Sequence, residues 1–153
     1  MSVSVHRPRE EAEGHLRLAL GLMATVGIPD DASEWEIRNA ISRAYYAVFH
    51  MCHALLALRQ VAKPSEHLTL HRTVHVELGE VSGQRMAHSH ALRKDADYNP
   101  RMVEAKEYQG SLDTFRIRAS ARLGQMRAEF ESYRKRIDEI TENGGTNGNP
   151  NAD

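Results

Sequence analysis

The sequence has few of the features that mark secreted, membrane-embedded or sheet-containing proteins. Its only cysteine is Cys52, so no internal disulfide can form, and a reducing compartment is expected. No apolar run approaches the roughly 20 residues that cross a bilayer, and the N-terminal stretch MSVSVHRPREE lacks the apolar core of a signal peptide. We therefore expect a cytoplasmic protein without a membrane partner.

Strand signals and a large excess of either charge are also absent. No alternating run of β-branched residues bounded by turns occurs, and no internal repeat of long period is present. The formal net charge of -1 gives no overall attraction to nucleic acid, so an electrostatic partner would need a local patch. With 153 residues, 41% of them apolar, the chain is long enough for one all-α domain with its own core.

The stretch from Ser33 to Leu58 predicts a buried central helix. Ser33 and Glu36 have the spacing of a capping box, in which hydroxyl and carboxylate satisfy two of the amide groups left unpaired at a helix start. Apolar residues then recur every three or four positions, which is the period of a helix face packed on a core. This stripe is Ile37, Ile41, Ala44, Val48, Cys52 and Leu55. A second stripe, which would let another helix approach closely, is Ala40, Ala44, Ala47 and Ala54.

Three prolines divide the chain into helical segments, because proline disfavours both a helix interior and a helical residue before it. Before Pro29, an amphipathic pattern predicts a helix of about four turns. Between Pro64 and Pro100, a short third helix and a polar fourth helix are expected, with a stop near Gly79. The apolar positions of these three helices are Ala12, Leu16, Ala19, Leu20, Met23, Leu70, Val74, Leu78, Met86, Ala87, Ala91 and Leu92.

The last segment predicts one long helix. Apolar residues alternate steps of three and four from Tyr108 to Ile140, as in a heptad-like seam. An unbroken helix from Val103 to Ile140 would be roughly 57 Å long at 1.5 Å per residue, so we expect its far end to project. A homodimer would then cover the exposed part of the seam. Residues 141–153 are small and polar and are expected to be a disordered tail, which leaves 8–140 as the domain.

Two sequence words resemble those of the HEPN domain family. SRAYYAVFH contains an AYYA core-helix word at 44–47, and RKDADY contains an R-x-x-A-D-Y word at 93–98. His71 comes from the helix between them, as in the small prokaryotic branch of that family. The resemblance covers about residues 10 to 135. It implies a HEPN-like up-and-down bundle of about five helices with a long C-terminal helix, commonly assembled as a dimer.

The resemblance also implies a function. Many HEPN domains are metal-independent endoribonucleases built on an Arg-x(4 to 6)-His motif, and many are paired with a nucleotidyltransferase antitoxin. Arginine can hold a phosphate with its planar fork of donors, and histidine can move a proton when the ribose 2′-hydroxyl attacks. We therefore predict an RNA-directed protein of a toxin–antitoxin or defence system that needs no cofactor.

Residues that match the family words are the first candidates for a catalytic site. Arg93, Asp97 and Tyr98 share one predicted helix, and we expect them to line a cleft with His71, in which Arg93 would bind phosphate. A surface ion pair between Arg93 and Asp97, four residues apart, is the structural alternative. Arg93 has no histidine at the spacing of the catalytic motif. The alternative function is therefore a non-catalytic HEPN subunit that docks a nucleotidyltransferase or a larger defence complex.

Two other pairs fit the bare spacing of the catalytic motif. A separation of seven positions brings the side chains of Arg43 and His50 to nearly the same helix face, and this pair is a second catalytic candidate. A structural or interface role is favoured for His50, because it lies in the core helix. Arg85 and His90 also fit, but five residues turn them about 140° apart.

Three histidines, His67, His71 and His75, have a spacing that can hold zinc on one helix face. No acidic cluster or HExxH word accompanies them, so a polar helix face is the favoured interpretation and no metal is predicted.

Basic residues gather on the last helix. Seven of them lie between Arg116 and Arg136, against only two glutamates. Such a stripe can follow a phosphate backbone through counterion release, whereas the alternative is a solvated face opposite an apolar seam. The four candidate nucleic-acid contacts are Arg116, Arg118, Arg122 and Arg127.

Overall fold

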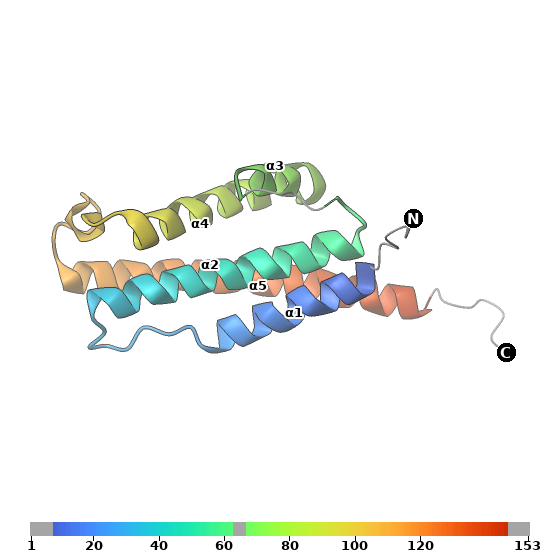
Figure 1. Ribbon diagram of the computed structural model, residues 1–153, viewed down its shortest axis with the longest axis horizontal. Helices are drawn as coiled ribbons and strands as arrows, with labels where there is room; N and C mark the ends of the chain where they lie inside the picture. Colours follow the sequence, from blue (N-terminus) through green and yellow to red (C-terminus); the bar gives the residue numbers. More distant parts are fainter. Residues whose placement is uncertain (1–7, 63–66, 147–153) are drawn as a thin grey trace, which may run out of the picture.

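The protein is an all-α bundle with a long C-terminal helix, as the sequence predicts (Figure 1). The structure is a computed structural model that describes residues 8–62 and 67–146. Within these ranges there are five α-helices, one 3₁₀ turn and no strand. The helices are α1 (Pro8–Ala24), α2 (Glu34–Leu58), α3 (His67–Leu78), α4 (Glu80–Tyr98) and α5 (Leu112–Thr146), and the 3₁₀ turn is η1 (Met102–Glu104).

The central helix is α2, against which α1, α4 and α5 all pack (Figure 1). Its predicted capping box is present. The Glu36 N–H donates to Ser33 Oγ at 3.2 Å, and the Ser33 N–H donates to the Glu36 carboxylate at 3.3 Å. Both predicted stripes of α2 are buried along their whole length, which confirms it as the core helix.

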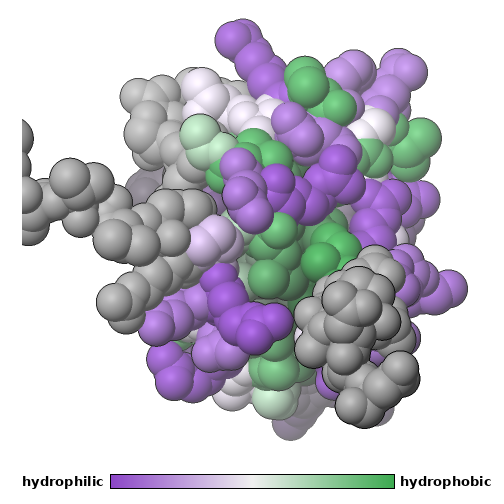
Figure 2. All heavy atoms as spheres, turned by 90° about the vertical axis from the view of Figure 1, so that its right-hand side faces the viewer, coloured by the Kyte–Doolittle hydropathy of each residue, from purple (hydrophilic) through white to green (hydrophobic). Residues whose placement is uncertain are grey.

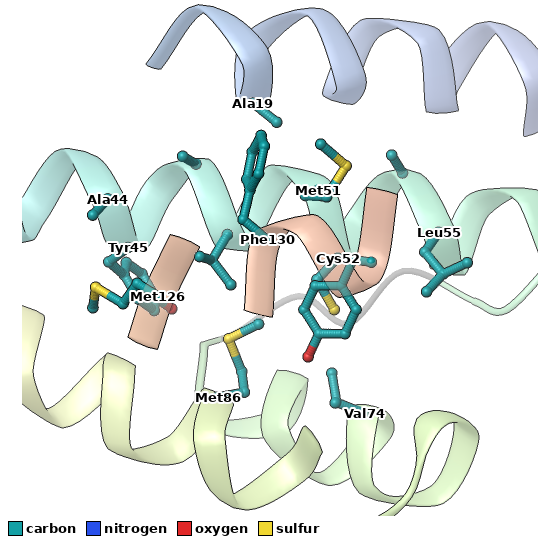
Figure 3. Packing of buried hydrophobic residues seen from close by; sticks show 14 of the residues in the cluster. Ala19, Ala44, Tyr45, Met51, Cys52, Leu55, Val74, Met86, Met126 and Phe130 are labelled. Carbon is teal, nitrogen blue, oxygen red and sulfur yellow. The ribbon is translucent and has the colours of Figure 1, made fainter. Parts of the chain in front are cut away.

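The main core lies where the other helices meet α2. Figure 3 shows Phe130 of α5 pointing toward Ala19 of α1, while Met86 of α4 and Val74 of α3 reach the cluster from the other side. All four side chains are buried. Apolar surface removed from water in this way stabilises the fold by roughly 25 cal/mol per Å². The small side chain of Ala19 leaves room for the aromatic ring, so α1 and α5 share one core.

The start of α5 differs from the prediction. A helix was expected from Val103, but α5 begins at Leu112, after η1 and a turn in which Gly110 has a positive φ of 68°. Tyr108 was expected on the helical seam and lies in this turn instead. Its ring nevertheless packs on Phe115, with the two centroids 4.8 Å apart, so a second apolar cluster forms at this end of the bundle.

The apolar seam of α5 is covered within the chain, contrary to the expectation. Met126, Phe130, Tyr133 and Ile137 are at most 5% exposed. The reason is that α2, with 25 residues, provides a partner surface along most of the seam. A bare seam therefore no longer supports the homodimer, which stays a prediction from the family resemblance. Light scattering at micromolar protein concentration tests it.

The end of α5 also lies further along the chain than expected. The helix continues past Ile140 to Thr146, so the predicted domain boundary falls inside it. The rest of the predicted tail, residues 147–153, lies outside the described residues.

An apolar hollow marks the end of the bundle where α1 begins and α2 and α5 end. Figure 2 looks onto this end and shows apolar side chains in the middle of the face, with polar ones around them. A cavity of about 310 Å³ lies between these helix ends. Its apolar lining is Ala12, Leu16, Ala54, Leu58, Ile137 and Ile140. None of the helices in the described part of the chain combines the length and apolar character of a membrane span.

Candidate functional site

The two sequence words that resemble HEPN domains lie against each other in space. Arg93 of α4 stacks over the rings of Tyr45 and Tyr46 of α2, with its Cζ 5.3 and 5.6 Å from their centroids. Its Nη1 donates to Asp97 Oδ2 at 3.4 Å, and Ser42 Oγ donates to the same oxygen at 3.4 Å. We call these five residues the α2–α4 junction.

Arg93 is packed inside this junction rather than presented to solvent. It is 6% exposed, and its Nε is buried without a hydrogen-bond partner among the described residues. A cation over an aromatic ring contributes about 0.5–2 kcal/mol. Burial raises the pKa of Tyr45 well above its ordinary value, although the nearby Arg93 charge lowers it in part, so Tyr45 stays a neutral phenol. The junction holds α4 against α2. The Arg93–Asp97 pair of the structural alternative is present, but Arg93 is buried and does not lie on the surface as that alternative had it.

A second arginine, which the sequence patterns did not single out, secures the end of α4. Arg38 of α2 is buried and donates from Nη1 to the carbonyl oxygens of Asp95 and Ala96, at 3.3 and 3.0 Å. Its Nη2 also pairs with Glu34 at 2.9 Å. The last carbonyls of a helix lack partners within that helix, so Arg38 supplies a donor to Ala96, whereas the Asp95 carbonyl also accepts from the Asn99 N–H at 3.0 Å.

His71 does not join the α2–α4 junction. Its carbonyl oxygen lies beside Gly83, 3.1 Å from where a Cβ on that glycine would be. Arg93 is ten residues further along α4, which is about 15 Å at 1.5 Å per residue. Tyr98 is 75% exposed at the end of α4. Of the residues predicted to line a cleft with Arg93, the structure therefore brings only Asp97 into contact with it.

Arg43 and His50 also have separate surroundings. Arg43 is exposed, whereas His50 is half-buried against α1, with its Nδ1 3.0 Å from Nδ1 of His15. His15 stacks on His53 as well, with ring centroids 5.2 Å apart. His50 therefore belongs to a contact between α1 and α2, in keeping with the structural role favoured for it.

No group of three His, Cys, Asp or Glu side chains in the described part of the chain has an arrangement that could hold a metal ion. His71 and His75 both line a shallow cavity of about 350 Å³ between α3 and α4. The side chain of His67, the third member of the predicted row, lies outside the described residues.

Two of the four predicted nucleic-acid contacts are engaged within the fold. Arg116 Nη2 donates to the carbonyl oxygen of Ala32 at 2.8 Å, and Arg127 Nη2 donates to that of Val26 at 2.6 Å. Both carbonyls belong to the loop that joins α1 to α2, residues 25–33. Arg116 and Arg127 therefore fasten this loop to α5 and do not present free guanidinium groups to a phosphate backbone.

The other two basic residues point elsewhere. At 100° per residue, Arg122 lies about 140° around the helix from Arg127, so the predicted stripe is divided between two flanks of α5. Arg118 is exposed. Arg122 Nη2 forms an ion pair with Glu107 Oε2 at 3.8 Å, and Arg122 also lines a cavity between α4 and α5. The flank that carries Arg122 is thus the one that faces a possible ligand site.

This cavity, which we call the α4–α5 cleft, has a volume of about 310 Å³. Most of the residues that line it are three or four positions apart on their helix, so one face of α4 and one face of α5 line the cavity. The lining residues are Arg85, His88, Ser89 and Leu92 of α4 and Arg122, Gln125, Met126, Ala128 and Glu129 of α5.

Glu129 is the buried charged residue of the α4–α5 cleft. It is 4% exposed, and its Oε1 accepts a hydrogen bond from the Tyr133 hydroxyl at 2.8 Å. Burial raises the pKa of Glu129 to about 7, while the Tyr133 hydrogen bond and the Arg85 charge offset part of that rise. A carboxyl group that titrates near neutral pH can both accept and release a proton under cellular conditions.

Three basic side chains line the same cavity as this carboxyl group. Arg85 lies near enough to Glu129 to influence its pKa, and Arg122 and His88 line the same cavity. Within the described part of the chain, the side chains of Arg85 and His88 form no hydrogen bond or ion pair. The cleft therefore combines donors for an anion with a carboxyl group that can transfer a proton.

A comparison of the chain with protein-family models, curated proteins and solved structures found no match. The likeness to HEPN domains therefore stays a prediction from the two sequence words.

Proposed function

We propose that this protein is an RNA-directed protein of HEPN type, from a toxin–antitoxin or defence system, and that it binds RNA in the α4–α5 cleft. The observation that carries the proposal is the placement of Arg85, Arg122 and His88 around one cavity. Guanidinium groups match the geometry of phosphate oxygens and remain charged at any cellular pH.

The remaining lining of the cleft also suits RNA. Ser89 and Gln125 offer hydrogen-bonding groups for a ribose hydroxyl, and Leu92 and Met126 offer apolar surface for the face of a base. The net charge of the chain is close to zero, so binding would depend on this local set of basic residues.

RNA binding can be tested with purified protein, tRNA and a mixed-sequence single-stranded RNA in EDTA at several salt concentrations. Arg85→Gln should weaken binding and lower the slope of log K against log salt by about 0.7–0.9, which is the expected value for one lost phosphate contact. Arg134→Gln is the matched control, because Arg134 lies on the other flank of α5 and pairs with Glu131 at 4.0 Å. Equal effects of both substitutions, or no binding by the parent chain, would refute the proposal.

A second function is favoured by the α2–α4 junction. Arg93, the residue that the family words suggest for phosphate binding, is buried under two tyrosine rings and pairs with Asp97. This supports a non-catalytic HEPN subunit that docks a nucleotidyltransferase or another defence subunit. Such a subunit should neither bind nor cleave RNA in the assay above, and it should form a stable complex with a nucleotidyltransferase from the same operon in size-exclusion chromatography.

A further inference from the structure

We infer that the α4–α5 cleft is a catalytic site for RNA cleavage, in which Glu129 is the general base and His88 the general acid. The inference rests on the proposed RNA-directed function and goes beyond the sequence words, neither of which includes a residue that lines this cleft. The cleft contains the three kinds of group that the reaction needs, namely a carboxyl, an imidazole and two guanidinium groups.

The reaction is an internal transfer that requires no metal and no second reactant. Glu129 accepts the proton of a ribose 2′-hydroxyl while the 2′ oxygen attacks the adjacent phosphorus. The P–O2′ bond forms and the P–O5′ bond breaks, and His88 gives a proton to the leaving 5′ oxygen. The products are a 2′,3′-cyclic phosphate and a 5′-hydroxyl. Arg85 and Arg122 stabilise the charge that develops on the phosphoryl oxygens.

The surroundings of Glu129 suit a general base. Its pKa of about 7 leaves a large fraction ionised at neutral pH and gives the carboxylate more basicity than an exposed glutamate. The hydrogen bond from Tyr133 restrains one carboxylate oxygen, which leaves Oε2 for proton transfer. Charged and titratable groups from three helices interact with Glu129. Besides the effect of burial, Arg85 of α4 lowers the pKa of Glu129, and the charge of Glu129 raises the pKa of Cys52 of α2 and of Tyr133 of α5.

A purely structural Glu129–Tyr133 hydrogen bond is the alternative, and the Glu129→Gln substitution distinguishes the two. Glutamine has nearly the same shape and retains an oxygen that accepts from the Tyr133 hydroxyl, but it cannot take up the proton of a 2′-hydroxyl. A structural role would leave cleavage intact in this variant, whereas a catalytic role would not.

The experiment uses the full chain, tRNA and a mixed-sequence single-stranded RNA in EDTA, with a 2′-deoxy version of the second as substrate control. The parent chain should cleave both RNAs, leave 2′,3′-cyclic phosphate ends and spare the deoxy version. At saturating RNA, Glu129→Gln and His88→Gln should each lower the cleavage rate by about 100-fold or more. Arg134→Gln should cleave like the parent chain.

The pH dependence of the rate provides a second measurement. The acidic limb of the parent profile should have a midpoint near the pKa of Glu129, about 7, and this limb should be lost in Glu129→Gln. Parental cleavage rates in both Glu129→Gln and His88→Gln would overturn the assignment. A parent chain that binds RNA without cleaving it overturns this inference alone, whereas one that does not bind RNA overturns the proposed function as well. Because His88 is exposed on α4, its variant gives a result even if Glu129→Gln fails to fold.

Discussion

Replacing Glu129 by glutamine should change how the stability of the protein depends on pH. The pKa of this carboxyl rises from its ordinary value of 4.5 to about 7 in the folded protein. Between these two values the folded chain binds more protons than the unfolded chain, so the stability of the parent protein falls as the pH rises through this window. At 1.36 kcal/mol per pKa unit, the loss is roughly 3 kcal/mol once the pH is above both values.

The glutamine variant lacks this loss, because its amide does not ionise and still accepts from Tyr133. Thermal unfolding of both proteins is followed by circular dichroism from about pH 5 to about pH 8. The difference in Tm between variant and parent at each pH isolates the contribution of Glu129, because all other titrating groups are present in both proteins. The variant should gain roughly 6–12 °C in Tm relative to the parent chain across this range. A difference that stays constant with pH would refute the burial and charge assigned to Glu129.

Three further predictions concern the fold. Val48→Asp should abolish cooperative thermal unfolding, since an unpaired charge at this fully buried site costs several kcal/mol of a total stability of about 5–15, and a soluble, cooperative variant would contradict the burial. Arg93→Ala should lower the unfolding free energy, measured by urea denaturation, by about 2 kcal/mol, because it removes contacts that join α4 to α2. Unchanged stability would contradict this structural role and favour a functional role for Arg93. Gly83→Ala should destabilise the protein by about 1–3 kcal/mol, because the new Cβ would lie 2.7 Å from the Cβ of His75. Gly124→Ala is the control: no described atom other than those of its own helix lies within 4 Å of its new Cβ, so it should stabilise α5 by up to about 1 kcal/mol. Equal Tm shifts in the two variants would count against the close packing of α3 on α4.

Local signals predicted the fold where one helix face stays apolar. The capping box and the buried stripe of α2 depend only on residues that are close in sequence, and both are present in the structure. The start of α5 was missed because Tyr108 continues the apolar period although it lies in a turn, where it packs on the same core. The signal that marks the true start is Gly110, with its positive φ, followed by Ser111, whose Oγ accepts from the Thr114 N–H.

The site was less predictable, because charge patterns do not show which groups the folded chain already uses. Arg116 and Arg127 resembled free cations, yet each donates to a loop carbonyl that is distant in sequence. Glu129 looked like an interruption of a basic stripe. Its position next to Phe130 on the apolar seam could have indicated burial, but its proximity to Arg85 depends on how α4 packs on α5.

The fastening of the α1–α2 loop by α5 has a consequence for how the chain is made. The carbonyl oxygens of Ala32 and Val26 receive their donors from residues 84 and 101 positions later, and the core contact near Ala19 involves Phe130. A nascent chain therefore has α1 and α2 outside the ribosome, with one apolar face of α2 still bare, for as long as α5 is being synthesised. Because α5 closes the core, newly made chains are most vulnerable to proteases and aggregation until α5 has left the ribosome.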